Sequence, residues 1–191
     1  MAQNDTDWEP LYFEFSFGLE HRAGRDIAST VQEAQLAEGV RLRGSIDLVE
    51  RHVHTGVLRV TDHKSGRALD QVPLYVGGGR TLQPLLYGLA GEKVLGLKVD
   101  SGRLFYATQR GGYQQMAILV NDRARIVLAH LLQDIDASIT SGFLPPVPDK
   151  ESCSFCDYRL VCGPYEEQRI GRFKNRSDER LESLTEIRGM G

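Results

Sequence analysis

Two acidic residues and a lysine have the types and spacing that most favour chemistry in this chain of 191 residues. Asp62 and Lys64 are two positions apart at the end of a segment with strand-like alternation, so both side chains leave the same face of a strand. Asp47 lies on the polar face of the preceding alternating segment. If the two strands pair, Asp47 and Asp62 converge on one divalent cation, and their hard oxygen ligands suit Mg²⁺ or Mn²⁺.

A lysine beside such a cation indicates hydrolysis of a phosphodiester bond. Lys64 would orient a water molecule or help to deprotonate it, and it would balance phosphate charge. The reaction needs an activated water, a Lewis acid on the phosphoryl oxygen and help for the leaving oxygen. Two carboxylates and a lysine on strands also occur as surface ion pairs, so the pattern alone leaves both interpretations open.

The patterns along the chain predict an α+β domain that would position these residues. The expected order is strands at 11–20, 40–49 and 57–63, a helix from 82 into the mid-90s, strands at 103–109 and 113–120, and a helix at 122–141. The first three strands are expected to form an antiparallel meander within a central mixed sheet. Asp100-Ser101-Gly102 is expected to be a turn, and Thr81 and Asn121 are expected to cap the two helices.

The residues around the two aspartates resemble the PD-(D/E)XK nucleases. Gly44-Ser45-Ile46-Asp47 and Asp62-His63-Lys64-Ser65-Gly66 are similar to the G-x-x-D and D-[YHF]-K-[ST]-G motifs of the RecB-like branch. Gln83 and Tyr87 match that branch's Q-x-x-x-Y motif, and their spacing puts both on one helix face. The resemblance covers about residues 11–188, and it implies a restriction-endonuclease-like core with helices flanking the sheet.

The resemblance also implies a set of site residues. The implied catalytic residues lie on or beside the predicted strands: Asp47, Asp62, Lys64, Gln83, Tyr87 and Glu14. His63 joins the two aspartates as an implied metal ligand. Glu14 matches an acidic position on the strand before the aspartate motif, and a structural glutamate is the alternative. Without the resemblance, Gln83 would be an exposed polar residue and Tyr87 would belong to the core.

Three cysteines, Cys153, Cys156 and Cys162, lie within ten positions and are the only cysteines of the chain. An odd number this close together is a poor disulfide framework and favours metal or iron–sulfur ligation. Thiolates suit both iron–sulfur and zinc, and three buried cysteines without metal are the alternative. The spacing resembles the C-terminal cluster of AddB-type and CRISPR-associated exonucleases, which implies a 4Fe–4S cluster with a fourth cysteine from far upstream.

Composition predicts one compact intracellular domain. The chain is 41% hydrophobic, its net charge is -3, and no apolar run approaches the roughly 20 residues of a membrane helix. The expected division is a flexible N-terminus (1–10), a nuclease core (11–148) and a C-terminal cysteine and helical segment (149–191). A cytoplasmic location is expected, with no membrane partner. The absence of the upstream helices found in family members suggests a truncated fragment.

The expected function is metal-dependent DNA exonuclease activity in recombination or repair, with a helicase domain or subunit as partner. The helicase context rests on the resemblance alone. Two alternatives remain: a catalytically incomplete DNA-binding or assembly module with the same fold, and a zinc-stabilised interaction domain.

Overall fold

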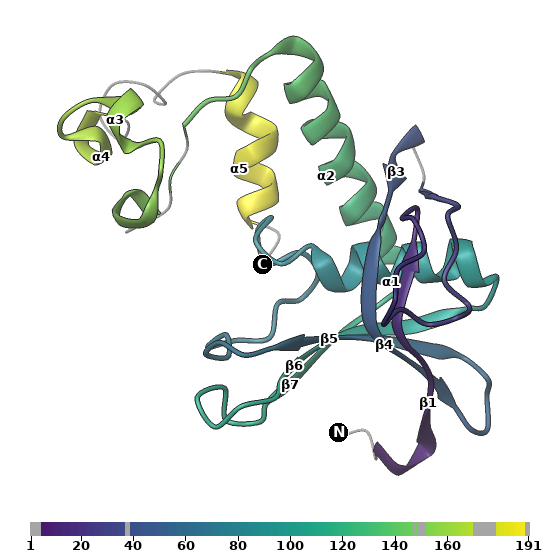
Figure 1. The fold of residues 1–191 in the computed structure, drawn as a ribbon. Coiled ribbons are helices and arrows are strands. Elements are labelled where there is room, and N and C mark those ends of the chain that lie inside the picture. Colours follow the sequence, from purple (N-terminus) through teal and green to yellow (C-terminus); the bar gives the residue numbers. More distant parts are fainter. Residues whose placement is uncertain (1–4, 37–38, 147, 149–151, 170–178, 190–191) are drawn as a thin grey trace.

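A mixed β-sheet forms the centre of the computed structural model (Figure 1), which describes residues 5–36, 39–146, 148, 152–169 and 179–189. In these residues the sheet has five strands in the order β1-β4-β5-β6-β7. Their bounds are β1 Trp8–Phe17, β4 Gly44–His52, β5 Leu58–Lys64, β6 Val99–Tyr106 and β7 Gln115–Leu119. A small two-stranded sheet is made by β2 (Ala34–Gln35) and β3 (Arg41–Leu42).

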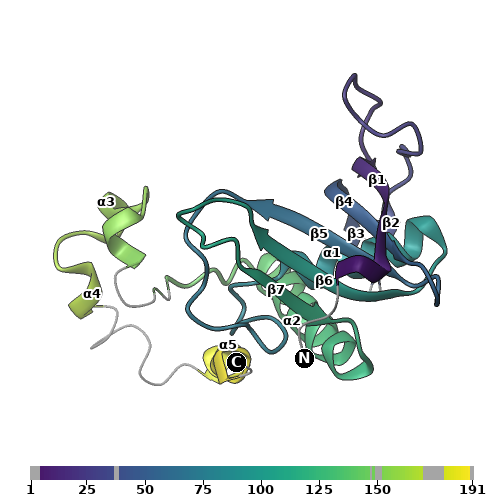
Figure 2. The same cartoon turned by 90° about the horizontal axis from the view of Figure 1, so that it is seen from below.

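Helices connect and follow these strands. The longer ones are α1 (Gln83–Leu95) between β5 and β6, α2 (Asp122–Ser141) after β7, and α5 (Glu182–Gly189). The short elements are η1 Asp5–Asp7, η3 Ser152–Phe155, α3 Arg159–Cys162, α4 Glu166–Arg169 and η5 Glu179–Leu181. Both views place α1, α2 and α5 on the same side of the sheet (Figures 1 and 2).

The directions of the strands confirm the predicted mixed sheet. β1, β4 and β5 pair antiparallel, β5 and β6 pair parallel, and β6 and β7 pair antiparallel. A parallel pair needs a crossover, and α1 provides it. The molecule therefore has the α+β arrangement expected from the order of elements and the restriction-endonuclease-like core that the resemblance implies.

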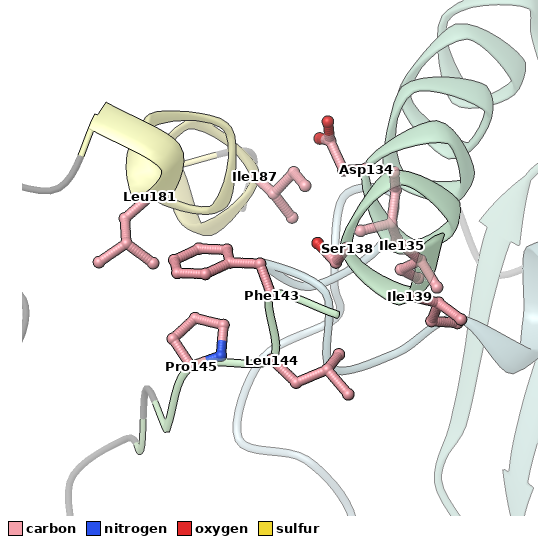
Figure 3. A pocket seen from close by; sticks show the side chains of 10 residues that line it. Asp134, Ile135, Ser138, Ile139, Phe143, Leu144, Pro145, Leu181 and Ile187 are labelled. Atoms are coloured by element: carbon pink, nitrogen blue, oxygen red, sulfur yellow. The ribbon is translucent and has the colours of Figure 1, made fainter. Parts of the chain in front are cut away.

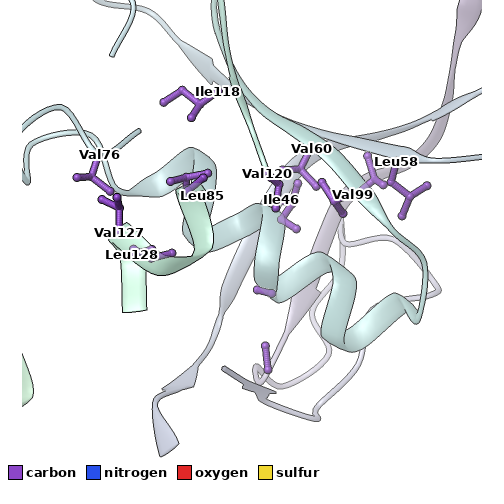
Figure 4. Packing of buried hydrophobic residues seen from close by; sticks show 14 of the residues in the cluster. Ile46, Leu58, Val60, Val76, Leu85, Val99, Ile118, Val120, Val127 and Leu128 are labelled. Carbon is purple, nitrogen blue, oxygen red and sulfur yellow. The ribbon is translucent and has the colours of Figure 1, made fainter. Parts of the chain in front are cut away.

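The core lies between the sheet and the helices (Figure 4). Two glycines on α1 let the helix approach the strands closely. A Cβ on Gly88 would lie 2.8 Å from Val120 Cγ2, and one on Gly91 would lie 3.4 Å from Val60 Cγ1. The two glycines lower the helix propensity of α1, but they also allow the helix to lie close to the sheet.

The first strand departs from the alternation read in the sequence. It begins at Trp8 and ends at Phe17, so residues 8–10 belong to the strand and not to the predicted flexible segment 1–10. Phe13 is 59% exposed, whereas Tyr12 and Phe15 pack on the core. Glu14 between them has a φ of 51°, and no β4 partner is paired with it. This irregularity changes which side chains face inward, and a strict period of two cannot predict it.

Two local predictions about turns and caps are wrong. Asp100, Ser101 and Gly102 lie within β6, and Ser101 and Gly102 pair with both β5 and β7, whereas Asp100 lies at a register shift of the β5–β6 ladder. The N-cap of α1 is Leu82 with no side-chain hydrogen bond, in place of Thr81. The N-cap of α2 is as predicted, because the Asn121 side chain accepts from Ala124 N. Gly142 ends the helix at a φ of 69°.

The last helix packs against α2. α5 lies beside α2, and an apolar cavity of about 370 Å³ lies between them and the segment 143–145 (Figure 3). Its lining includes Ile135, Phe143 and Ile187. Among the residues that the structure describes, no helix has both the length and the apolar character needed to cross a membrane.

Candidate active site

Asp62 and Lys64 lie at the end of β5 on the face that α1 covers. Val60, two residues before Asp62, is buried in the core, and the polar residues continue the same face beyond it. Asp62 is 7% exposed. Lys64 Nζ lies 2.6 Å from Asp62 Oδ2, so the lysine is held against the carboxylate.

Gln83 closes a ring of three side chains. Its Nε2 donates to Asp62 Oδ1 at 2.5 Å, and its Oε1 accepts from Lys64 Nζ at 2.7 Å. Gln83 is the first residue of α1, and its neighbour Pro84 lies against the backbone of β6: a Cβ on Gly102 would be 2.1 Å from the Pro84 oxygen. The crossover helix therefore fixes the position of the amide, and the predicted placement of this helix beside the site is found.

Asp47 lies at the point where the β4–β5 ladder ends. The pairing of the two strands stops at Leu48 and Thr61, and beyond it Asp47 Oδ2 accepts the backbone N–H of His63 at 2.7 Å. Standard bond lengths then put this oxygen no more than about 5 Å from the Asp62 Cα. The Asp47 carboxylate thus accepts an N–H that a backbone carbonyl of β4 would accept if the ladder continued. This hydrogen bond holds Asp47 at the end of β5.

The histidine between Asp62 and Lys64 turns toward the other face of the sheet. Alternation along β5 separates its side chain from theirs, and its ring packs against Phe105 at 5.7 Å. His63 Nδ1 is 3.6 Å from Asp47 Oδ2. The histidine is thus next to one of the two aspartates, and its role as a metal ligand stays a prediction.

Tyr87 and Glu14 lie farther from the ring. Tyr87, one turn after Gln83, packs edge-on against Phe17 at 6.3 Å and stands over Gly44, where a Cβ would be 3.3 Å from its Cε1. It supports the start of the strand that carries Asp47. On β1, Glu14 lies opposite Asp47, because its neighbours on either side pair with Leu48 and Ile46. Its side chain is 54% exposed, and its Oε2 is 3.9 Å from Arg25 Nη1.

A buried polar cluster on the opposite face holds the strands in place. Glu50 accepts from Arg59 at 2.9 and 2.8 Å, from Thr61 at 2.9 Å and from Arg103 at 2.8 Å. These residues come from β4, β5 and β6, so the cluster ties together the three strands that surround Asp62. The sequence alone does not indicate that these residues form a cluster. Glutamate and arginine are rarely buried in a protein unless they are paired.

The cysteines do not converge. Cys153 is buried on η3, Cys156 is exposed just after η3, and Cys162 is half-buried at the end of α3. In the described parts of the chain, no group of three or more His, Cys, Asp and Glu side chains is arranged to hold a metal ion. The placement seen here therefore does not fit an iron–sulfur or zinc site.

Comparison with known families agrees with this geometry. The sequence profile of the PD-(D/E)XK nuclease superfamily matches residues 1–163. The chain belongs to the PD-(D/E)XK nuclease superfamily. This membership and the mixed sheet support nuclease activity as the general function, and the residues that resemble the superfamily's acidic and lysine motifs meet at the end of β5.

The chain is also similar to a phage protein. The chain is 28% identical over 128 residues to the Gene 69 protein of Mycobacterium phage L5. The match covers 65% of this chain and 40% of that protein. The chain thus spans about two fifths of the length of the curated relative that it matches.

The donor set of this PD-(D/E)XK site fits a hard divalent cation. Asp62 Oδ2 is buried and, among the described residues, accepts no hydrogen bond; Lys64 reaches it only as an ion pair outside hydrogen-bond angles. Mg²⁺ keeps several waters and often takes one or two protein carboxylates, so a group of three side chains is not required. Asp47 and Asp62 are the residues that would hold the ion.

Proposed function

We propose that the chain is the catalytic domain of a Mg²⁺- or Mn²⁺-dependent DNA exonuclease. The observation that carries this proposal is the ring of Asp62, Lys64 and Gln83 beside Asp47. It combines carboxylate oxygens for a cation with a lysine that contacts the same carboxylate. Membership of the nuclease superfamily supports the reaction class.

The side chains divide the hydrolysis between them. A divalent cation bound by Asp47 and Asp62 would supply the Lewis acid for the phosphoryl oxygen. Lys64 orients the attacking water and balances the charge that grows on the phosphate. Gln83 hydrogen-bonds to both Lys64 and Asp62 and so fixes the two side chains relative to each other. As the water oxygen bonds to phosphorus, the ester P–O bond breaks, one proton leaves the water, and the departing oxygen takes up a proton from solvent.

Metal-dependent cleavage of end-labelled linear DNA tests this proposal. We expect cleavage with Mg²⁺ or Mn²⁺ and none with EDTA. Asp62→Asn and Lys64→Ala should each lower the rate on the order of 100-fold or more. Asp70→Asn is the matched control, because Asp70 is exposed in the loop after β5. Undiminished cleavage by Asp62→Asn would exclude the mechanism.

The exonuclease assignment has its own test. Closed circular DNA without ends should resist the enzyme, and linear DNA of the same sequence should be shortened from its ends. Cleavage of both forms at similar rates would make the enzyme an endonuclease. A role in recombination or repair, with a helicase as partner, rests on the RecB-like motifs and predicts that the site works beside a helicase domain or subunit.

A DNA-binding module without activity is the second candidate. The absence of a three-ligand group among the described residues favours it. It predicts that the protein binds DNA but cleaves neither linear nor circular DNA with any divalent metal, and that Asp62→Asn leaves binding unchanged.

A further inference from the structure

A cleft beside β1 gathers three arginines. It has a volume of about 410 Å³ and lies between the loop after β1 and the start of β4. Its lining residues are Gly18, Leu19, Glu20, Arg22, Arg25 and Arg43. Three of the lining residues are arginines and one is a glutamate, and Glu14 lies beside Arg25 at 3.9 Å, so this arginine cleft has an excess of positive charge in a chain whose net charge is -3.

The loop that carries Arg22 and Arg25 is fixed to the edge of β1. Gly18 N donates to Thr30 O and Gln32 O at 3.0 and 2.9 Å. Ser16 N donates to Ser29 Oγ at 2.9 Å, and Phe13 N donates to Asp26 Oδ2 at 3.1 Å. These bonds join both ends of the loop to one strand, so the arginines are displayed by a fixed wall of the cleft.

Gly18 lets the loop close on Arg43. Its φ is 66°, and a Cβ at this position would lie 2.6 Å from Arg43 Cβ. Only glycine combines this backbone conformation with such a close approach at low cost. The glycine thus brings Arg43, the residue immediately before β4, into the same cleft as Arg22 and Arg25.

Arg25 has an unsatisfied nitrogen. Among the residues that the structure describes, its Nη1 is buried and has no hydrogen-bond acceptor. The nearest acid is Glu14, whose Oε2 is 3.9 Å away and whose side chain is 54% exposed. An ion pair this long and this exposed contributes little, so Arg25, whose side chain is 28% exposed, keeps its positive charge for an anion in the cleft.

We propose that the arginine cleft binds a phosphate of the DNA strand that is being cleaved. Guanidinium groups match phosphate oxygens in a bidentate geometry, and no sequence-specific contact is required for this. Arg43 is four residues before Asp47, which is about 13 Å along a strand. That length corresponds to about four nucleotides of rise in B-form DNA. The cleft thereby holds the strand a few nucleotides from the reacting bond, and this inference rests on the proposed function.

Binding of a single-stranded oligonucleotide in EDTA tests the cleft without any need for cleavage. Fluorescence anisotropy over a series of salt concentrations gives both the Kd and its salt dependence. For the double variant Arg25→Gln/Arg43→Gln, we expect a Kd at least about tenfold weaker. The slope of log K against log salt should fall by about 0.7 for each phosphate that the variant no longer neutralises.

Arg41→Gln is the matched control. Arg41 is two residues before Arg43, its side chain is 70% exposed, it pairs with Glu33 at 3.5 Å, and it does not line the cleft. Its replacement should leave the Kd and the salt slope close to those of the unchanged protein. Because Arg25 is partly buried, the exposed Arg43→Gln variant alone provides a second test if the double variant does not fold.

Two oligonucleotides distinguish the kind of phosphate. If the cleft holds a terminal phosphate, replacing a 5′-phosphate by a 5′-hydroxyl weakens binding by the unchanged protein to the level of the double variant. If the cleft holds an internal phosphodiester, the unchanged protein binds both oligonucleotides with the same Kd, and the double variant binds both more weakly. Either result supports a phosphate site.

The outcomes for the cleft and for the nuclease function are separate. An unchanged Kd and salt slope in the folded variants would overturn the cleft, even if the protein cleaves DNA. Weakened, less salt-dependent binding in a protein that cleaves nothing would leave the cleft in place and remove the proposed exonuclease function.

Discussion

Gln83 donates a hydrogen bond of 2.5 Å to Asp62, although the two residues are 21 positions apart and lie on a helix and a strand. The same amide accepts from Lys64 at 2.7 Å. Replacing Gln83 by leucine removes both bonds and leaves the ion pair with Asp62 to position the lysine. We expect the cleavage rate to fall on the order of 10–100-fold, as when a partner that orients a metal-site ligand is removed.

The measurement is kcat and KM for linear DNA. The decrease should fall mainly on kcat, because the amide orients catalytic groups and lies beside the carboxylate. Lys93→Ala, on the exposed face at the other end of α1, is the control and should change neither value. An unchanged kcat in Gln83→Leu would show that the ring is only a packing feature.

A second prediction concerns the ion pair that joins α1 to α2. Arg125 donates to Glu92 at 2.7 and 2.9 Å, and Glu92 also accepts from Val99 N at 2.9 Å. Burial pushes the pKa of Glu92 up, but the hydrogen bonds from Arg125 and Val99 and the charges of Arg125 and Lys98 outweigh it, so the pKa is lowered. Glu92→Gln should reduce the free energy of unfolding by about 1–2 kcal/mol at pH 7.

The pH dependence of this contribution has a definite sign. A carboxylate whose pKa is lower in the folded state stabilises the protein fully above its unfolded pKa and loses this effect as the pH falls through the folded value. Urea unfolding should therefore show the gap between the unchanged protein and Glu92→Gln closing below about pH 4.5, the ordinary value for glutamate. A gap that widened on acidification would contradict the assignment.

A third prediction concerns Gly102, which does not touch the site. A Cβ there would lie 2.1 Å from the Pro84 oxygen, so Gly102→Ala must push β6 and the start of α1 apart. We expect a decrease of about 1–3 kcal/mol in unfolding free energy. Activity at a temperature where the variant is folded should also fall, because Gln83 precedes Pro84. Gly189→Ala, where a Cβ meets nothing within 4 Å, is the control and should change neither quantity.

The cysteines give a fourth prediction, which follows from counting ligands. A 4Fe–4S cluster usually takes four thiolates, and this chain has three cysteines. We expect the purified chain to contain little iron and little inorganic sulfide. Elemental analysis with a visible absorption spectrum measures this. A stable, stoichiometric four-iron cluster in this chain would show that the ligand count is the wrong argument.

The contacts of Asp62 decide how its removal affects stability. Repulsion between Asp47 and Asp62 alone would make Asp62→Ala stabilising. The charge of Asp62 is instead offset by Lys64, and Asp47 accepts a backbone N–H. Removing Asp62 leaves the Lys64 ammonium and the Gln83 amide without this partner, so we expect Asp62→Ala to be neutral or slightly destabilising in urea unfolding.

The sequence predicts those parts of the site that depend on short-range geometry. The two-residue spacing of Asp62 and Lys64 fixes their common face, and the antiparallel pairing expected for the strands at 40–49 and 57–63 brings Asp47 beside them. The position of Gln83 beside the site is expected only from the Q-x-x-x-Y motif. Alternation cannot predict it, because a helix after a long loop can pack on either face of a sheet. Simple alternation puts Phe13 inward, but the strand is irregular at Glu14 and Phe13 is exposed.

The arginine cleft could not be found from the sequence in the same way. Arg22, Arg25 and Arg43 are spread over 22 positions, and they are brought together by the hydrogen bonds between the loop and β1 and by the close approach of Gly18 to Arg43. Gly18 carries a signal, since a glycine directly after an apolar strand indicates a special backbone conformation or a close approach. The glycine alone does not predict which residue lies close to it.

The hairpin made by β4 and β5 has a consequence for how metal ions act on stability. It holds Asp47, Asp62 and Lys64 within residues 47–64, so closing one short loop brings both acids together. Such a loop forms transiently in the unfolded chain, which can then bind divalent ions weakly. A ligand that also binds the unfolded state raises Tm by less than its affinity for the native state implies. Magnesium should therefore stabilise this protein less than a Kd measured on the folded form would suggest.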